Sequence, residues 1–219
     1  MLTVACVLVR ANVAYTTDYV RRLRGMVMRH LPRPHRFVCF TDQPAAVSKV
    51  PGVHDVINVP TPVDLPGWWS KLELFNKEHG LTGDCLYLDL DVLLVRDLTK
   101  VVDHSARFAL VPPAGTFKGR DGKKVVTRFN SSVMKFRFGD HDYLYDECTR
   151  AIKEELWGDQ DWIGQRNRTG ETMPLAWFPR ISEVRVPPKW PEEAKIILCK
   201  KPKNHEAAKK WSWFNEVWQ

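Results

Sequence analysis

The chain has 219 residues, of which 44% are hydrophobic and 27% are charged. This length suits one α/β domain over residues 1–219, and the composition excludes a disordered chain because it supplies enough apolar side chains for a substantial core. The net charge of +7 fits either an ordinary lysine-rich surface or an anionic partner, such as nucleotide phosphates, nucleic acid or a membrane surface.

The N-terminal part of the chain predicts strands that alternate with a helix. Leu2–Val9 is an apolar, β-branched run, typical of a strand buried on both faces. A helix is expected next, ending at the prolines that follow Leu31. Further strands are predicted at Arg36–Thr41 and Val53–Val59. This order indicates a doubly wound α/β sheet.

The middle of the chain continues the same pattern. Gly67–Gly80 is interpreted as a helix bounded by glycines, and Asp84–Leu94 contains another buried strand. Two more strands are expected at Phe108–Val111 and Phe129–Phe136. Between them, Ala114–Arg128 is interpreted as a long basic loop.

The C-terminal part combines a helical pattern with an aromatic tail. Apolar residues at four-residue steps from Leu144 to Leu156 predict one helix. For the aromatic tail, packing in the core is favoured over stacking on sugars or bases and over seating on a membrane. Its residues are Trp190, Trp211, Trp213, Phe214 and Trp218.

Cysteine usage and the start of the chain predict the compartment. The five cysteines are odd in number and no pair has zinc-site spacing. Cys6, Cys39 and Cys85 lie in apolar, strand-like runs and are interpreted as buried apolar residues in a reducing compartment. No signal peptide is visible, and the first apolar run is far shorter than the about 20 residues of a spanning helix. We therefore expect a cytoplasmic protein with no integral membrane association.

Two carboxylates, Asp89 and Asp91, follow the buried run at 85–88. Because residues i and i+2 of a strand face the same way, we expect both side chains on one side of the strand end. Two like charges placed together need a positive partner, and Mn²⁺ or Mg²⁺ suits such oxygen ligands. The alternative is a pair of loop carboxylates that face water.

Four segments together resemble the GT-A fold glycosyltransferases, and within them the retaining family of glycogenin and the bacterial lipopolysaccharide galactosyltransferases. They are residues 2–31, LYLDLDVLL at 86–94, FNSSVM at 129–134 and GDQD at 158–161. The resemblance implies a GT-A (Rossmann-like) mixed sheet flanked by helices. It also implies a metal-dependent glycosyltransferase with a nucleotide-sugar donor, most naturally a UDP-sugar. The family's front-face mechanism, which retains the configuration of the anomeric carbon, is the mechanism that the resemblance implies here, because no Asp or Glu nucleophile is obvious.

The resemblance further implies roles for single residues. Asp89 and Asp91 would hold the metal against the donor diphosphate. Asn130 would bond the donor sugar or the acceptor, Asp159 would hold sugar hydroxyls, and Gln160 would lie beside the anomeric carbon. The alternative for these three is that they are ordinary polar residues of turns and strand ends. The residues implied at the donor are Val9, Arg10, Asn12, Tyr15, Asp42, Lys71, Asp89 and Lys201.

The chain departs from the family pattern at two places. Ser132 stands where the family has glycine, which puts a side chain near the sugar. The family's third metal ligand is a histidine, and its position here falls on an apolar residue between Ile196 and Leu198. His205 is the expected substitute, with Cys199 as the alternative, although a thiolate suits Mn²⁺ and Mg²⁺ poorly.

The acceptor is predicted from charge. Residues 107–137 contain eight Lys or Arg side chains against one acid. A neutral sugar has no use for so many cations, so a polyanion such as DNA with hydroxymethylated bases is one expected acceptor, and a cell-surface glycan is the other. The central cations of this acceptor-side loop are Lys118, Arg120, Lys123 and Lys124.

Two other classes of protein share part of these features. A nucleotidyltransferase would share the sheet and the paired carboxylates, but it would usually show a glycine-rich signature after the first strand, and Val9–Asn12 has none. A non-catalytic nucleic-acid-binding protein would explain the basic loop and the tryptophans. It would leave the clusters at 89–91 and 159–161 unexplained.

Overall fold

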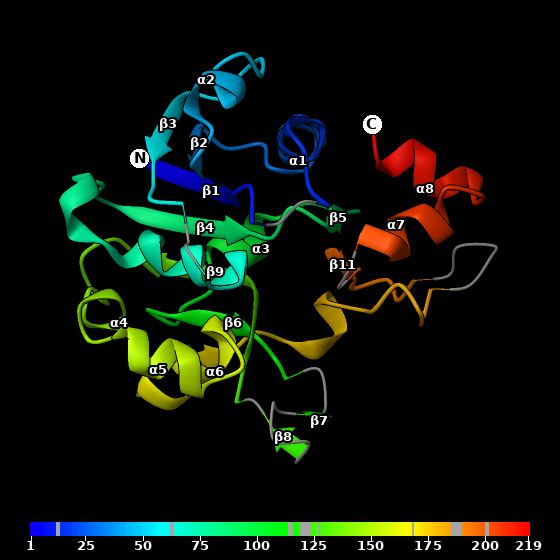
Figure 1. The fold of residues 1–219 in the computed structure, drawn as a ribbon. Helices are drawn as coiled ribbons and strands as arrows, with labels where there is room; N and C mark the ends of the chain where they lie inside the picture. The colour runs from blue at the N-terminus through cyan, green and yellow to red at the C-terminus, as the bar shows by residue number, and fades with distance from the viewer. Residues whose placement is uncertain are drawn as a thin grey trace.

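The computed structural model describes residues 1–219 except 12–13, 62–63, 114–115, 119–123, 127, 168, 185–189 and 200–201, and only the backbone of 116–118, 124–126 and 202–203. The described residues form helices around a central seven-stranded sheet (Figure 1). Among them, no helix is long and apolar enough to span a membrane.

The central sheet has the strand order β10-β6-β9-β4-β1-β2-β3. Strands β1 to β4 run parallel where they pair, whereas β9 runs antiparallel to both of its neighbours, β4 and β6. The mixed sheet predicted from the sequence is confirmed. Its strands are β1 (Leu2–Leu8), β2 (His35–Thr41), β3 (Asp55–Asn58), β4 (Asp84–Leu88), β6 (Ala109–Val111), β9 (Asn130–Arg137) and β10 (Glu171–Thr172).

The order of the parallel strands reverses at β1. The chain places β2 and β3 on one side of β1 and then returns to place β4 on its other side. The register pairs Leu8 with Thr41, so β1 and β2 end at the same level. Ligands of open α/β sheets bind outside the carboxyl ends of the strands at such a switch point. This topology directs attention to the residues that follow β1 and β4.

Helices cover both faces of the sheet, with α1 and α2 on one face and α4, α5 and α6 on the other (Figure 1). The α-helices are α1 (Thr17–His30), α2 (Pro44–Val47), α3 (Thr99–Val102), α4 (Tyr143–Asp146), α5 (Arg150–Glu155), α6 (Asp159–Arg166), α7 (Pro202–Ala208) and α8 (Ser212–Val217). The 3₁₀ helices are η1 (Gly67–Phe75), η2 (Lys77–His79) and η3 (Leu175–Trp177).

Each face of the sheet has its own hydrophobic core. Val4, Cys6 and Leu8 of β1 pack in the core under α1, and the residues between them pack in the core with η1, α4 and α6. Burial on both faces explains why β1 is apolar at nearly every position. All five cysteines are buried and free, which confirms the interpretation of Cys6, Cys39 and Cys85 as buried apolar residues.

The C-terminal segment packs against α1 and the middle of the chain. The short strand β5 (Val92–Leu94) pairs antiparallel with β11 (Ile196–Leu198), and α7 and α8 follow β11. Arg29 of α1 donates to the carbonyl of Val217 at 2.7 Å. Trp213, Phe214 and Trp218 are buried, as favoured from the sequence, while Trp190 and Trp211 are half-buried.

The structure corrects three predicted elements. The segment 67–80 forms 3₁₀ helices rather than an α-helix, and its residues 69–75 are all buried, so that stretch has no solvent face. The single helix expected from Leu144 to Leu156 is divided into α4 and α5, because the Thr149 hydroxyl accepts from the Ile152 amide and caps a new helix. Within the predicted basic loop, the backbone pairs as the hairpin of β7 (Thr116–Lys118) and β8 (Lys124–Val126).

Candidate active site

The ends of three strands bring the candidate residues to one edge of the sheet. β1 is followed by Val9 and Arg10, β2 by Asp42, and β4 by Asp89. Because β9 runs in the opposite direction, its first residue, Asn130, lies at the same edge. The switch point between β1 and β4 is therefore lined by residues that the sequence singled out.

Asp89 and Asp91 lie in the turn between β4 and β5 rather than in a strand. The expectation that strand alternation aligns them is therefore wrong, and the turn positions them instead. The Asp89 amide donates to the Ser132 carbonyl at 2.8 Å, which ties the turn to β9. The Asp91 side chain is buried, and Tyr15 donates its hydroxyl hydrogen to Asp91 Oδ2 at 2.9 Å.

Lys71 joins this turn to the start of α6. Its ammonium nitrogen lies 3.1 Å from Asp89 Oδ1 and 3.2 Å from Asp159 Oδ2. Lys71 is 7% exposed and Asp159 is 4% exposed, so this is a buried ion-pair network rather than a surface contact. Lys71 is therefore not a solvated lysine on a helix surface, but a buried residue of the 3₁₀ helix η1. Residues far apart in the sequence are thereby held in one cluster.

Two further residues of the cluster were missed from the sequence. Ser131 donates its hydroxyl hydrogen to Asp159 Oδ2 at 2.7 Å, and its oxygen lies 3.1 Å from the Lys71 ammonium. Tyr87 donates to Asp89 Oδ1 at 2.6 Å. The spacing of Tyr87, two residues before Asp89, was an available signal. Nothing in the sequence pairs Ser131 with Asp159, because only the fold brings β9 to α6.

The electrostatics of the cluster leave negative charge at the turn. Burial raises the pKa of Asp91 to about 7, and the neighbouring Asp89 adds to the rise, against hydrogen bonding from Tyr15. For Lys71, burial acts to lower the pKa, but Asp159 and Asp89 outweigh it, so the net pKa is raised and the ammonium stays charged. A second cation beside Asp91 would stabilise its ionised form.

The two candidates for a third metal ligand are both buried. His205 is fully buried, and its Nε2 donates to the Asp91 backbone carbonyl at 2.9 Å, since a carbonyl can only accept. Its Nδ1 has no partner among the described residues. Cys199 is also fully buried. No three His, Cys, Asp or Glu side chains of the described segments gather into a metal-binding group, so the third ligand stays a prediction.

On the other side of β1, Asp42 organises the residues expected at the nucleoside. Its carboxylate accepts from the Arg10 amide at 3.0 Å and from the Thr61 hydroxyl at 2.9 Å. The Arg10 side chain remains largely exposed, whereas Val9 is fully buried. Arg10 and Asp42 thus form a polar rim beside the end of β1.

The remaining expected residues divide into two groups. Asn130 is buried and accepts from the Ser132 amide at 2.8 Å, which fixes its side chain, and Gln160 is half-buried in the first turn of α6. Others lie outside the described residues or have undescribed side chains, so the structure does not test their roles. These are Asn12, Lys201, Lys118, Arg120, Lys123 and Lys124.

Comparison with known proteins identifies the fold. No family model and no curated protein sequence matches the chain. The structure is similar to the galactosyltransferase LgtC in complex with donor and acceptor sugar analogues, with 12% identity and a TM-score of 0.61 over 98% of this chain and 94% of that one. An active-site glutamine-to-glutamate mutant of LgtC gives 14% identity and a TM-score of 0.63, again over 98% of this chain and 94% of that one. The chain therefore has the GT-A fold, as the resemblance implied.

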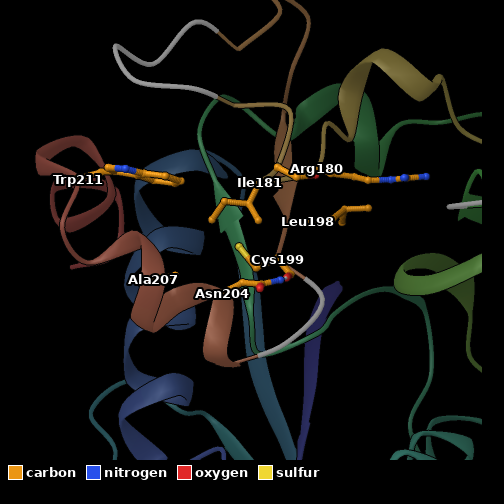
Figure 2. A pocket seen from close by; sticks show the side chains of 8 residues that line it. Arg180, Ile181, Leu198, Cys199, Asn204, Ala207 and Trp211 are labelled. Carbon is orange, nitrogen blue, oxygen red and sulfur yellow. The ribbon is translucent and has the colours of Figure 1, made fainter.

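A pocket lies beside β11 and near the carboxylate turn, because Leu198, which lines it, pairs with Val92, the residue after Asp91. It has a volume of about 300 Å³ and lies next to the strand that pairs with β5. Figure 2 shows Trp211 and Arg180 on opposite sides of it, with Cys199 and Asn204 between them. The amide of Asn204 donates to the Cys199 carbonyl. None of these residues belongs to the network around Lys71.

Proposed function

We propose that the protein is a metal-dependent, retaining glycosyltransferase that takes a sugar from a UDP-sugar. The observation that carries this proposal is the buried network in which Lys71 joins Asp89 of the turn after β4 to Asp159 of α6. It lies at the switch point of a GT-A sheet, and ligands of open α/β sheets bind at such points.

The two carboxylates of the turn fit a hard divalent cation. Asp91 is buried with its pKa raised to about 7, and Lys71 contacts Asp89 but no Asp91 oxygen in the described ion pairs. Asp89 and Asp91 would hold Mn²⁺ or Mg²⁺, with donor phosphate oxygens as further ligands. When bound, the metal supplies positive charge against the charge that develops on the leaving diphosphate.

The residues of the chain would bind and orient the donor. Arg10 and Asp42 lie together beside the end of β1 and would contact the nucleoside. Tyr15, which donates to Asp91, would contact the donor at the carboxylate turn, and Asp159 would accept hydrogen bonds from sugar hydroxyls. Asn130, held by its bond to the Ser132 amide, would donate its amide hydrogens to the sugar or the acceptor. Fixed donors and acceptors of this kind lower the barrier by holding the reacting groups in place.

In the transfer, the acceptor hydroxyl oxygen forms a bond to the anomeric carbon as the bond from that carbon to the phosphate oxygen breaks. The hydroxyl proton passes to an oxygen of the leaving UDP. Attack from the face that the diphosphate leaves retains the configuration. Gln160 would then contact the opposite face of the sugar without forming a bond to it.

The four central cations of the acceptor prediction have side chains that the structure does not describe. Lys118 and Lys124 are described only in backbone, and Arg120 and Lys123 lie outside the described residues. Modification of DNA therefore stays a prediction from the sequence, beside the alternative of a glycan. Trp213 and Trp218 are buried and do not offer a face for base stacking.

A thermal-shift screen tests the proposed class. Ligands that bind the native state raise the unfolding temperature by mass action. We expect UDP, UDP-glucose or UDP-galactose to raise it with Mn²⁺ and not with EDTA. A rise with nucleoside triphosphates alone would indicate the nucleotidyltransferase alternative. A rise with DNA alone would indicate a nucleic-acid-binding protein.

A further inference from the structure

Two exposed tryptophans lie beside the Lys71–Asp159 ion pair. Trp68 is 42% exposed and precedes Lys71 by three residues, and Trp157 is 44% exposed and precedes Asp159 by two. Because Lys71 Nζ lies 3.2 Å from Asp159 Oδ2, the segments that carry the two indoles are held next to each other. Few other large apolar side chains are as exposed among the described residues.

Gly158 permits this arrangement. A Cβ added at Gly158 would lie 3.0 Å from Trp68 Nε1 and 3.2 Å from Trp68 Cδ1, which is closer than a side chain normally approaches. The Trp68 indole therefore packs directly against the backbone between Trp157 and Asp159. The backbone of Gly158 and Trp157 also donates hydrogen bonds to the Asp161 carboxylate. These bonds lower the pKa of Asp161, but burial and Asp159 outweigh them, so the pKa is raised.

We propose that Trp68 and Trp157 form an aromatic platform that binds the acceptor as a neutral pyranose. The proposal rests on the glycosyltransferase activity proposed above and names the class of its acceptor. Indole faces bind the apolar face of a sugar ring, and exposed aromatic surface beside a polar cluster marks a binding site. A ring seated there would lie next to Asp159 and Gln160, where the donor sugar is expected.

The charge around the platform favours a neutral acceptor over a polyanion. Residues 150–161 carry two basic and four acidic side chains, and the Arg150 guanidinium is occupied by Glu154 at 2.7 Å. Asp159 and Asp161 are buried, so the other charges of this segment balance and offer phosphate or sulfate groups no excess of positive charge. The occupant that fits is an uncharged carbohydrate, and DNA is an alternative that the test separates.

The test is calorimetric titration with neutral disaccharides in the presence of UDP and Mn²⁺. Maltose, cellobiose, lactose and melibiose serve as probes, and a heparin disaccharide and a DNA oligonucleotide serve as anionic probes. We expect at least one neutral disaccharide to bind. Trp68→Ala and Trp157→Ala should each weaken that binding by about tenfold, the size of one aromatic contact. Trp157→Phe should restore most of it, and Met28→Ala, at an exposed apolar residue of α1, serves as the control.

UDP binding in the same samples separates the two proposals. If UDP binds with Mn²⁺ but no neutral sugar binds, or the tryptophan variants bind sugar as the wild type does, the platform is wrong and the proposed function stands. Tighter binding of an anionic probe than of every neutral one also contradicts the platform. Sugar binding that depends on both tryptophans without UDP binding would support the platform and contradict the proposed function. Unchanged UDP binding in Trp68→Ala excludes misfolding as the cause of a loss.

Discussion

At the scale of single residues, Lys71 holds the charges of the site together. Its ammonium contacts two carboxylates and the Ser131 hydroxyl within a buried network. Removing one member of such a network is costly, because the remaining charges stay buried without their partner. A lysine on a protein surface has no comparable effect.

Lys71→Met should therefore destabilise the fold and weaken UDP binding together. We expect the free energy of unfolding to fall by about 3 kcal/mol, as for a broken buried ion pair. Lys77→Met is the matched control, because the ion pair of Lys77 with Asp146 is largely exposed at 3.4 Å and should contribute little. Urea denaturation measures both variants, and equal losses would contradict the role given to Lys71.

His141 makes stability depend on pH. It is 5% exposed beside Phe108, neither ring nitrogen has a partner among the described residues, and burial lowers its pKa. A group whose folded pKa is depressed binds protons more readily when unfolded, so the free energy of unfolding should fall as pH drops below about 6.5.

His141→Phe should flatten this loss, because phenylalanine fills the same aromatic cluster without titrating. Equilibrium unfolding between pH 7.5 and 5 gives the slope for both proteins. His205, whose pKa burial lowers to about 4, contributes part of the slope that remains. An identical slope in the variant would show that His141 is not protonated on unfolding in this range.

At the scale of elements, the strands of the central sheet except β10 were predicted from the sequence, whereas the helices beside the site were not. Strands buried on both faces, such as β1, are continuous apolar runs. Such a run can be identified in the sequence without knowing which strands lie beside it. In η1, by contrast, Ser70, Lys71 and Glu73 are buried, so polar residues do not mark a solvent face there. A helical pattern cannot reveal polar side chains that turn inward to make an ion pair.

The C-terminal helices stabilise the carboxylate turn through His205. This residue lies on α7, packs against Trp218 of the tail with ring centroids 4.3 Å apart, and donates to the Asp91 carbonyl. His205→Ala should therefore reduce donor turnover more than Cys199→Ser, whether the histidine holds the backbone of the turn or binds the metal. Steady-state kinetics with the UDP-sugar identified by thermal shift compares them, and a larger loss in Cys199→Ser would make the choice of His205 wrong.

At the scale of the whole molecule, the GT-A fold was predicted from four short segments and is confirmed by the structure. The order and spacing of the segments carried that prediction, since each segment alone is common. The contacts within the site were harder to predict from the sequence, because Lys71, Ser131 and Asp159 come from three elements separated by at least 28 residues. Their pairing depends on the antiparallel β9 and on the packing of α6.

The most direct test of the central claim is calorimetric titration of UDP in the presence and absence of Mn²⁺, with the wild type, Asp89→Asn and Asp91→Asn. The wild type should bind UDP with Mn²⁺ and lose binding with EDTA. Both variants should fall below detection while remaining folded, and Asp91→Asn should be no less stable than the wild type at pH 8, because it removes a buried charge whose pKa is raised to about 7. Undiminished Mn²⁺-dependent affinity for UDP in both folded variants would contradict a metal site at this turn.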